Sequence, residues 1–109
     1  PRIDRHDIEP LEGDVLLAEG IVRAAQGREE QAESVFGQAV SVDQRYSLPW
    51  DEAKVYYASA LATIEHSVPR ARRASLQRGR ELLERAQTLW ESVGALPYAA
   101  RCRRRLAEL

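Results

Sequence analysis

The side chains of this sequence that could do chemistry are few, and their spacing matches no metal site. His6 stands between Asp4 and Asp7 in the stretch RIDRHDIE, a mixture of ligand types that could bind a metal ion weakly. The other histidine, His66, lies far along the chain, so no ligand spacing links the two. The single cysteine, Cys102, can form neither an internal disulfide nor a cysteine-based zinc site. We therefore predict no metal site and no cofactor.

Catalytic templates are absent as well. The sequence holds no GxxxxGK phosphate loop, no GxSxG motif and no cysteine–histidine pair at a suggestive spacing. The adjacent acids Glu29–Glu30 and Asp51–Glu52 stand where the first turns of expected helices favour negative charge, and His66 stands near an expected helix end. These residues read as partners of helix dipoles. We predict no catalytic residue and no enzymatic activity.

The arginines offer a different kind of chemistry, the binding of anions. The segment PRARRASLQRGR, residues 69–80, carries five arginines and no acid: Arg70, Arg72, Arg73, Arg78 and Arg80. We interpret it as a solvated projection that pairs with acidic surface of this or another copy, with an anionic partner as the alternative. Its stretch RRASL, residues 72–76, is also typical of a basophilic kinase substrate, with Ser75 as the acceptor.

A second basic segment, residues 101–105, lies near the end of the sequence. Arg101, Arg104 and Arg105 share one helical face, but the opposite face carries an apolar stripe of Tyr98, Cys102, Leu106 and Leu109. A helix with such a stripe is committed to packing, so we interpret its arginines as the solvated face. Nucleic-acid binding by segments 69–80 and 101–105 together remains the alternative function.

The charge is divided unevenly along the chain, although the net charge is only -1. Residues 1–66 hold six basic and thirteen acidic side chains, whereas residues 67–109 hold ten basic and four acidic ones. Such an asymmetry can steer partners or favour head-to-tail self-association.

These residues must be positioned by helices, because no stretch alternates like a strand and helical spacing occurs throughout. After a flexible lead at 1–9, we expect a single helical domain over 10–109. Its helices are expected at about 10–26, 28–44, 49–66, 71–93 and 97–109. No run approaches the ~20 apolar residues of a membrane span. The lack of methionine indicates a piece of a longer protein, and the single cysteine fits a reducing, cytoplasmic setting.

The expected helices differ in how they should pack. Helix 28–44 has one dry stripe, formed by Ala32, Val35, Phe36, Ala39 and Val40. Helix 10–26 is apolar on nearly every side, which predicts that it is packed between neighbours. The early turns of helix 71–93 are polar and should project, with Gly79 weakening the junction.

The spacing of small and large residues resembles the tetratricopeptide repeat, a helix–turn–helix unit of 34 residues. Gly20, the turn residue Gly27, and then Ala32, Phe36 and Ala39 carry the resemblance in a first unit at about 13–46. The sequence departs from the family at three places: Glu19 replaces a leucine, Arg23 an aromatic residue and Gln44 the closing proline.

A second unit at about 50–93 aligns with an insertion. Tyr56 and Ala60 take the large and small places on its first helix, and Gly79, Leu83 and Ala86 take those on its second. The segment 97–109 is then a capping helix or the first helix of a third unit. The resemblance implies an all-α fold of about five helices, stacked as antiparallel pairs in a right-handed solenoid. A non-repeat helical bundle is the alternative.

The last two helices carry a narrower resemblance. They are similar to the closing repeats of bacterial LuxR-type regulators with an ATPase domain, and of ATPase-linked nucleotide cyclases. The matching residues are Leu89, Trp90, Gly94, Ala95, Pro97, Ala99, Ala100, Arg101 and Leu106. This resemblance implies a setting inside a larger signalling or transcriptional regulator and no particular activity.

In tetratricopeptide repeats the first helices line a concave surface. The resemblance assigns to that surface Asp14, Leu17, Ile21, Lys54, Tyr57, Leu61 and Ile64. Such a groove suits a protein segment or peptide. The alternative is that its apolar residues pack against neighbouring repeats, so that the isolated chain exposes apolar surface and self-associates, as a homodimer for example. We predict a scaffold for protein–protein interaction or self-association.

Overall fold

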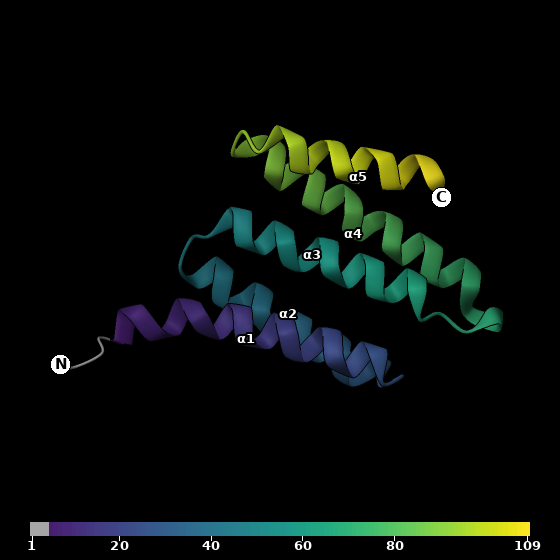
Figure 1. Ribbon diagram of the computed structural model, residues 1–109, viewed down its shortest axis with the longest axis horizontal. Coiled ribbons are helices and arrows are strands. Elements are labelled where there is room, and N and C mark those ends of the chain that lie inside the picture. Colours follow the sequence, from purple (N-terminus) through teal and green to yellow (C-terminus); the bar gives the residue numbers. More distant parts are fainter. Residues whose placement is uncertain (1–4) are drawn as a thin grey trace.

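The computed structural model describes residues 5–109, with side chains from residue 11 onward, and it is built from helices alone. The five α-helices are α1 (Arg5–Ala25), α2 (Glu29–Arg45), α3 (Pro49–Glu65), α4 (Arg72–Ser92) and α5 (Leu96–Glu108), with a short 3-10 helix η1 (Pro69–Ala71) before α4 (Figure 1). No strand occurs among the described residues. The prediction of an all-α fold with about five helices is confirmed.

The helix ends follow from glycine and proline. Gly27 and Gly94 have φ angles of 77° and 76°, the left-handed conformation in which glycine ends a helix without strain. Pro49 and Pro97 lie in the first turns of α3 and α5, where the missing N–H costs nothing. One boundary differs from expectation: α1 begins at Arg5, so the predicted lead is shorter. Its remaining part, residues 1–4, lies outside the described residues.

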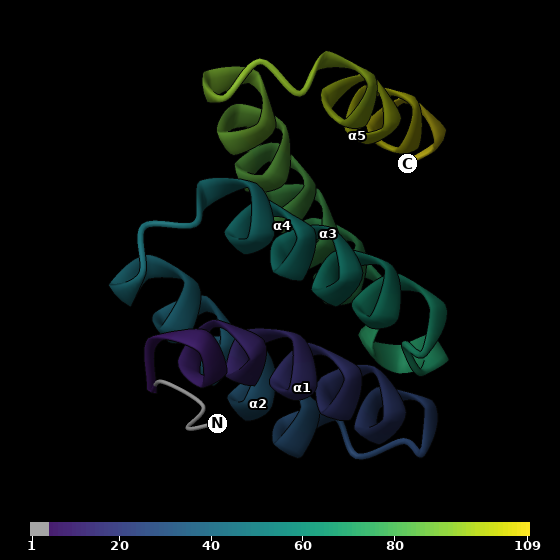
Figure 2. The same ribbon diagram turned by 60° about the vertical axis from the view of Figure 1, so that its left-hand side comes forward.

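The helices form two layers. Each one packs against the next along the chain, and α1 also contacts α3. Figure 1 shows α1, α3 and α5 side by side, with α2 and α4 behind them, and Figure 2 shows the same arrangement turned by 60°. The Cα extents of 52 × 32 × 16 Å agree with this, because two helices 8–10 Å apart fill the shortest dimension.

The packing of α1 against α2 depends on Gly20. The core between α1, α2 and α3 consists of Leu17, Ala24, Ala32, Phe36, Ala39 and Val55. Gly20 lies directly against the ring of Phe36, where a Cβ atom would come within 2.6 Å of ring carbon Cε1. The small residue therefore permits the close crossing of α1 and α2.

A second core lies between α3, α4 and α5, and Gly79 belongs to it. Leu82, Leu83, Ala86 and Trp90 of α4 are buried there. A Cβ atom at Gly79 would lie 2.6 Å from the side chain of Ile64 on α3. The expectation that Gly79 weakens a projecting junction is wrong, because the residue is buried and allows α3 and α4 to approach.

The expectation for α1 is also wrong. Leu11, Val15, Ile21 and Val22 are exposed by 46–65%. The helices α2 and α3 cover only one side of α1, so the other side has no neighbour among the described residues. None of the described helices is long and apolar enough to span a lipid bilayer.

Candidate interaction surfaces

The layer of α1, α3 and α5 brings charged and aromatic side chains from all three helices to one face. The Nζ atom of Lys54 on α3 lies 3.6 Å from the Oδ1 atom of Asp14 on α1. The same ammonium group lies 5.9 Å from the ring centroid of Trp50. Both members of the ion pair are about half exposed, so it contributes little to stability and leaves both charges available at the surface.

A hollow of about 310 Å³ opens between α3 and α5, and we call it the α3–α5 hollow. Its lining consists of Tyr57, Arg101, Arg104, Arg105 and Glu108. Hydrogen bonding to Tyr57 is the largest cause that raises the pKa of Arg105, and Glu108, 3.5 Å away, acts in the same direction. The hollow therefore combines an aromatic hydroxyl with three cations and one anion.

The ring of Tyr57 is held in place by an aromatic cluster. Trp90 is buried at its centre, with ring centroids 5.9 Å from Trp50, 5.7 Å from Tyr57 and 5.2 Å from Tyr98. The guanidinium of Arg101 lies 4.9 Å above the ring of Tyr98. Aromatic pairs at these distances stabilise the packing behind the wall of the α3–α5 hollow.

The structure divides the predicted groove residues into two groups. Asp14 and Ile21 are exposed, and Lys54, Tyr57 and Leu61 are half-buried. Ile64 is also half-buried and contacts Gly79 of α4. Leu17 belongs to the core, because it is 7% exposed and packs among Ala24, Phe36 and Val55. The assignment of Leu17 to a groove is wrong, because it faces neighbouring helices of this chain.

Residues of α5 complete this face, although the sequence pattern indicates a solvated face or a nucleic-acid contact and no link to Tyr57. Arg101, Arg104 and Arg105 are exposed, as predicted, but they also surround Tyr57 of α3. One signal could have identified them, which is the possibility that 97–109 is the first helix of a third unit. In that arrangement this helix lies in the same layer as the helix that carries Tyr57.

The predicted basic patch is divided by the helix that carries it. Arg70, Arg72, Arg73 and Arg80 line one hollow of about 580 Å³. Arg78 points to the other side of α4, where its guanidinium lies 3.9 Å from Glu33 of α2 and 3.7 Å from Glu81. Arg78 therefore does not belong to the patch and serves as a link between α4 and α2.

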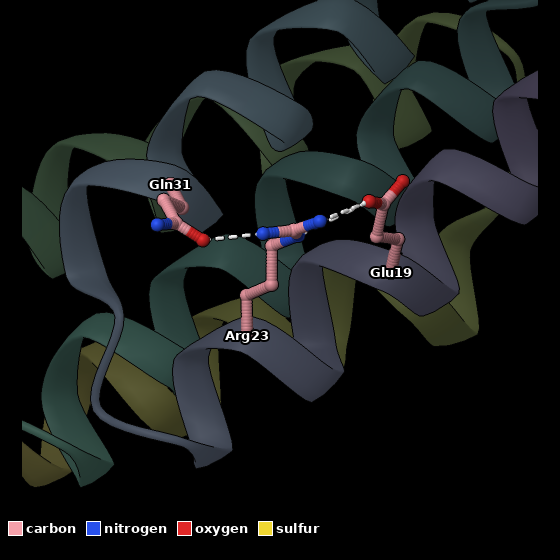
Figure 3. A network of polar contacts seen from close by, with 3 residues as sticks. All are labelled: Glu19, Arg23 and Gln31. Carbon is pink, nitrogen blue, oxygen red and sulfur yellow. Dashed lines mark hydrogen bonds and ion pairs between the residues drawn. The ribbon is translucent and has the colours of Figure 1, made fainter.

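Two of the departures from the repeat pattern compensate each other. Arg23 donates hydrogen bonds from Nε and a terminal nitrogen to Oε1 of Glu19, at 3.1 and 2.7 Å, and a further one to Oε1 of Gln31 on α2. Figure 3 shows Arg23 between these two partners. A polar contact thus joins α1 to α2 at positions where the tetratricopeptide pattern in the sequence analysis expects apolar side chains.

One carboxyl group is buried at the α1–α2 contact. Asp43 is 3% exposed, and it is the one buried charged side chain among residues 11–109. A Cβ atom at Gly13 would lie 2.6 Å from its Oδ1 atom, so this glycine lets the carboxyl approach the backbone of α1. Nothing in the sequence pattern distinguishes Asp43 from a solvated acid near a helix end.

The surroundings of Asp43 disfavour its charged form. The pKa of Asp43 is raised to about 6, and burial is the largest cause. The negative charges of Asp51, Asp14 and Glu52 contribute to this increase, and Lys54 opposes it. The carboxyl therefore gains its proton at mildly acidic pH.

Metal binding has no support from the side chains described. Among residues 11–109, no three side chains of the histidine, cysteine, aspartate and glutamate types are arranged to hold a metal ion. His66 is exposed at the C-terminal cap of α3, as the sequence predicts, and the side chain of His6 lies outside the described residues. Comparisons with family models, curated proteins and solved structures find no match.

Proposed function

We propose that this chain is a helical scaffold that works by binding other protein surfaces, including further copies of itself, and that it catalyses no reaction. The observation that carries this proposal is the uncovered apolar side of α1. Leu11, Val15 and Val22 recur on it at helical spacing, with exposures of 58%, 65% and 53%. Several large apolar side chains on one exposed face of a helix are typical of a surface that another protein covers.

The tetratricopeptide resemblance supports the same proposal. In such repeats every helix pair is covered by its neighbours, and an end pair leaves its outer side open. The stacking of α1, α3 and α5 in one layer agrees with this arrangement. The closing residues from Leu89 to Leu106 support a setting within a larger cytoplasmic bacterial regulator. The gene sequence on both sides of this segment tests that setting, and flanks without a catalytic or DNA-binding domain would contradict it.

The exposed side of α1 can be tested directly by sedimentation velocity over a range of protein concentrations. We expect the chain to self-associate through α1, and Val15→Glu to weaken that association by about tenfold or more, because a charge cannot be buried unpaired in an apolar contact. The matched control is Gln38→Glu on the exposed face of α2, which adds the same charge away from α1. Monomeric behaviour up to millimolar concentration would contradict self-association.

A further inference from the structure

The N-terminal half of α4 extends beyond its neighbour. α4 has 21 residues and α5 has 13, and α5 runs back along the C-terminal half of α4 (Figure 1). A hollow of about 580 Å³ lies beside the start of α4, and Leu109, which follows α5, is part of its lining. We call it the α4 hollow. Its lining includes Arg70 of η1, Arg72, Arg73, Leu76 and Arg80 of α4, and Leu109.

Four arginines line the α4 hollow, and no acidic side chain is part of its lining. No carboxylate lies within ion-pair distance of Arg70, Arg73 or Arg80 in the part of the chain that the structure describes. Arg72 donates to the carbonyl oxygen of Ile64 at 2.8 Å and to Ser67 Oγ at 2.9 Å, which leaves its positive charge unbalanced. The absence of acid is local, since Arg78 on the opposite side of α4 has two carboxylate neighbours.

Electrostatics favours a negatively charged occupant. Four like charges around one hollow repel each other, and positive charge near the first turn of a helix is unfavourable. The first turn of α4 carries no acid. A carboxylate in the hollow would relieve both effects, and the planar arginine groups can each hold a carboxylate through two hydrogen bonds.

The apolar side chains in the lining favour a protein partner over a nucleic acid. Leu76 is half-buried and Leu109 is exposed, so the hollow offers apolar surface between the cations. It has no aromatic side chain on which a nucleic-acid base could stack. The arginines of 101–105 do not extend it, because Arg101, Arg104 and Arg105 line the separate α3–α5 hollow. The two basic segments that the nucleic-acid alternative uses therefore line different hollows.

We propose that the α4 hollow binds a segment of another protein that carries both carboxylates and apolar side chains. The carboxylates pair with Arg70, Arg73 and Arg80, and an apolar side chain fits between Leu76 and Leu109. This site is separate from the exposed side of α1, so it does not depend on the proposed function of α1.

The test uses a short fluorescein-labelled peptide of glutamate and leucine at helical spacing, with binding followed by fluorescence anisotropy. We expect the chain to bind it, and Arg73→Gln/Arg80→Gln to weaken binding by about tenfold or more, because two charge-assisted hydrogen-bonding groups are lost. The control Arg45→Gln/Arg103→Gln removes two exposed arginines elsewhere and should leave binding unchanged. Circular dichroism checks that each variant is folded.

A second pair, Arg70→Gln/Arg73→Gln, alters only exposed side chains and keeps the test valid if the first pair unfolds the chain. Replacing the leucines of the peptide by serine should also weaken binding. The proposal is overturned if the peptide does not bind, if both arginine pairs leave its affinity unchanged, or if an oligothymidylate of equal charge binds as tightly. A different result would identify a second copy of this chain as the occupant. In that case the chain self-associates, the arginine variants abolish the association, and the peptide does not inhibit it. Val15→Glu should not affect peptide binding, which separates this test from that of α1.

Discussion

Gly20 of α1 lies so close to Phe36 of α2 that a Cβ atom at position 20 would come within 2.6 Å of the phenyl ring. The ring is 5% exposed and has little room to move. We expect Gly20→Ala to lower the free energy of unfolding by about 1–3 kcal/mol through overpacking. Urea unfolding followed by circular dichroism measures this change.

The chain offers a matched control for that substitution. Gly37 lies on the exposed side of α2, and a Cβ atom there would have no neighbour within 4 Å. Gly37→Ala should raise the free energy of unfolding by about 0.5–1 kcal/mol, because alanine is the better helix former. If both substitutions stabilise the chain equally, the close crossing of α1 and α2 does not constrain position 20.

The buried carboxyl of Asp43 should make stability depend on pH. Its pKa is about 6 in the folded chain and has a reference value of 3.8, so the folded state binds its proton more tightly. The stability due to protonation is fully present below pH 3.8 and is lost as pH rises through about 6. The loss is up to about 3 kcal/mol, since one pKa unit corresponds to about 1.4 kcal/mol.

Asp43→Asn isolates this effect from the other acids of the chain. Above pH 6 the variant should unfold at higher urea concentration than the wild type, and below pH 4 the two should converge. The measurement is the difference in free energy of unfolding across this pH range. A difference that stays constant with pH would mean that Asp43 titrates normally.

Tyr57 should show two separable roles. Its ring lies 5.7 Å from that of Trp90, whereas its hydroxyl group faces Arg105 in the α3–α5 hollow. We expect Tyr57→Ala to cost about 2 kcal/mol or more, because the aromatic cluster loses a ring. Tyr57→Phe should cost about 1 kcal/mol or less. Thermal unfolding compares the two, and equal losses would show that the hydroxyl group carries the stability.

The thiol of Cys102 should be inert in the folded chain. It has no exposed surface, and burial raises its pKa to about 11. At pH 8 we expect its reaction with a disulfide reagent to proceed only as fast as the chain opens, and to become rapid in urea. It is the single cysteine, so the signal has one origin. Equal rates with and without urea would contradict the packing of α5 on α4.

The helices themselves could be predicted because their signals are local. The stripe of α2 recurs every three or four residues, and four of its five members are buried while Val40 is half-buried. Gly27 and Gly94 both have the positive φ angle expected of a residue that ends a helix. Periodicity and turn chemistry depend only on neighbours in the chain.

The faces of the helices were harder to predict, because they depend on crossings between helices. Adjacent positions on a helix differ by about 100°. An error of one position in the assigned face is therefore enough to place Leu17 in a groove instead of the core. For Ile64 the decisive residue is Gly79, which lies in a different helix and lets α4 approach. The burial of Asp43 depends in the same way on Gly13, thirty residues earlier.

The role of α1 could not be predicted from its composition. Apolar residues on nearly every side indicate a helix with several neighbours, and the described chain supplies neighbours on one side only. The departures Glu19 and Arg23 appeared to weaken the repeat pattern when considered singly. Arg23 bonds Glu19 within α1, but its further hydrogen bond to Gln31 depends on the position of α2 and is visible only in three dimensions.

The aromatic cluster around Trp90 makes the intrinsic fluorescence of this chain a regional probe. The chain has two tryptophans, Trp50 and Trp90, and their rings lie 5.9 Å apart at the junction of α3, α4 and α5. The hairpin of α1 and α2 contains none. If that hairpin opens first, as stacked units can, the helical signal in circular dichroism will fall while the emission spectrum hardly changes. Two optical signals can thus distinguish unfolding of one end from unfolding of the whole.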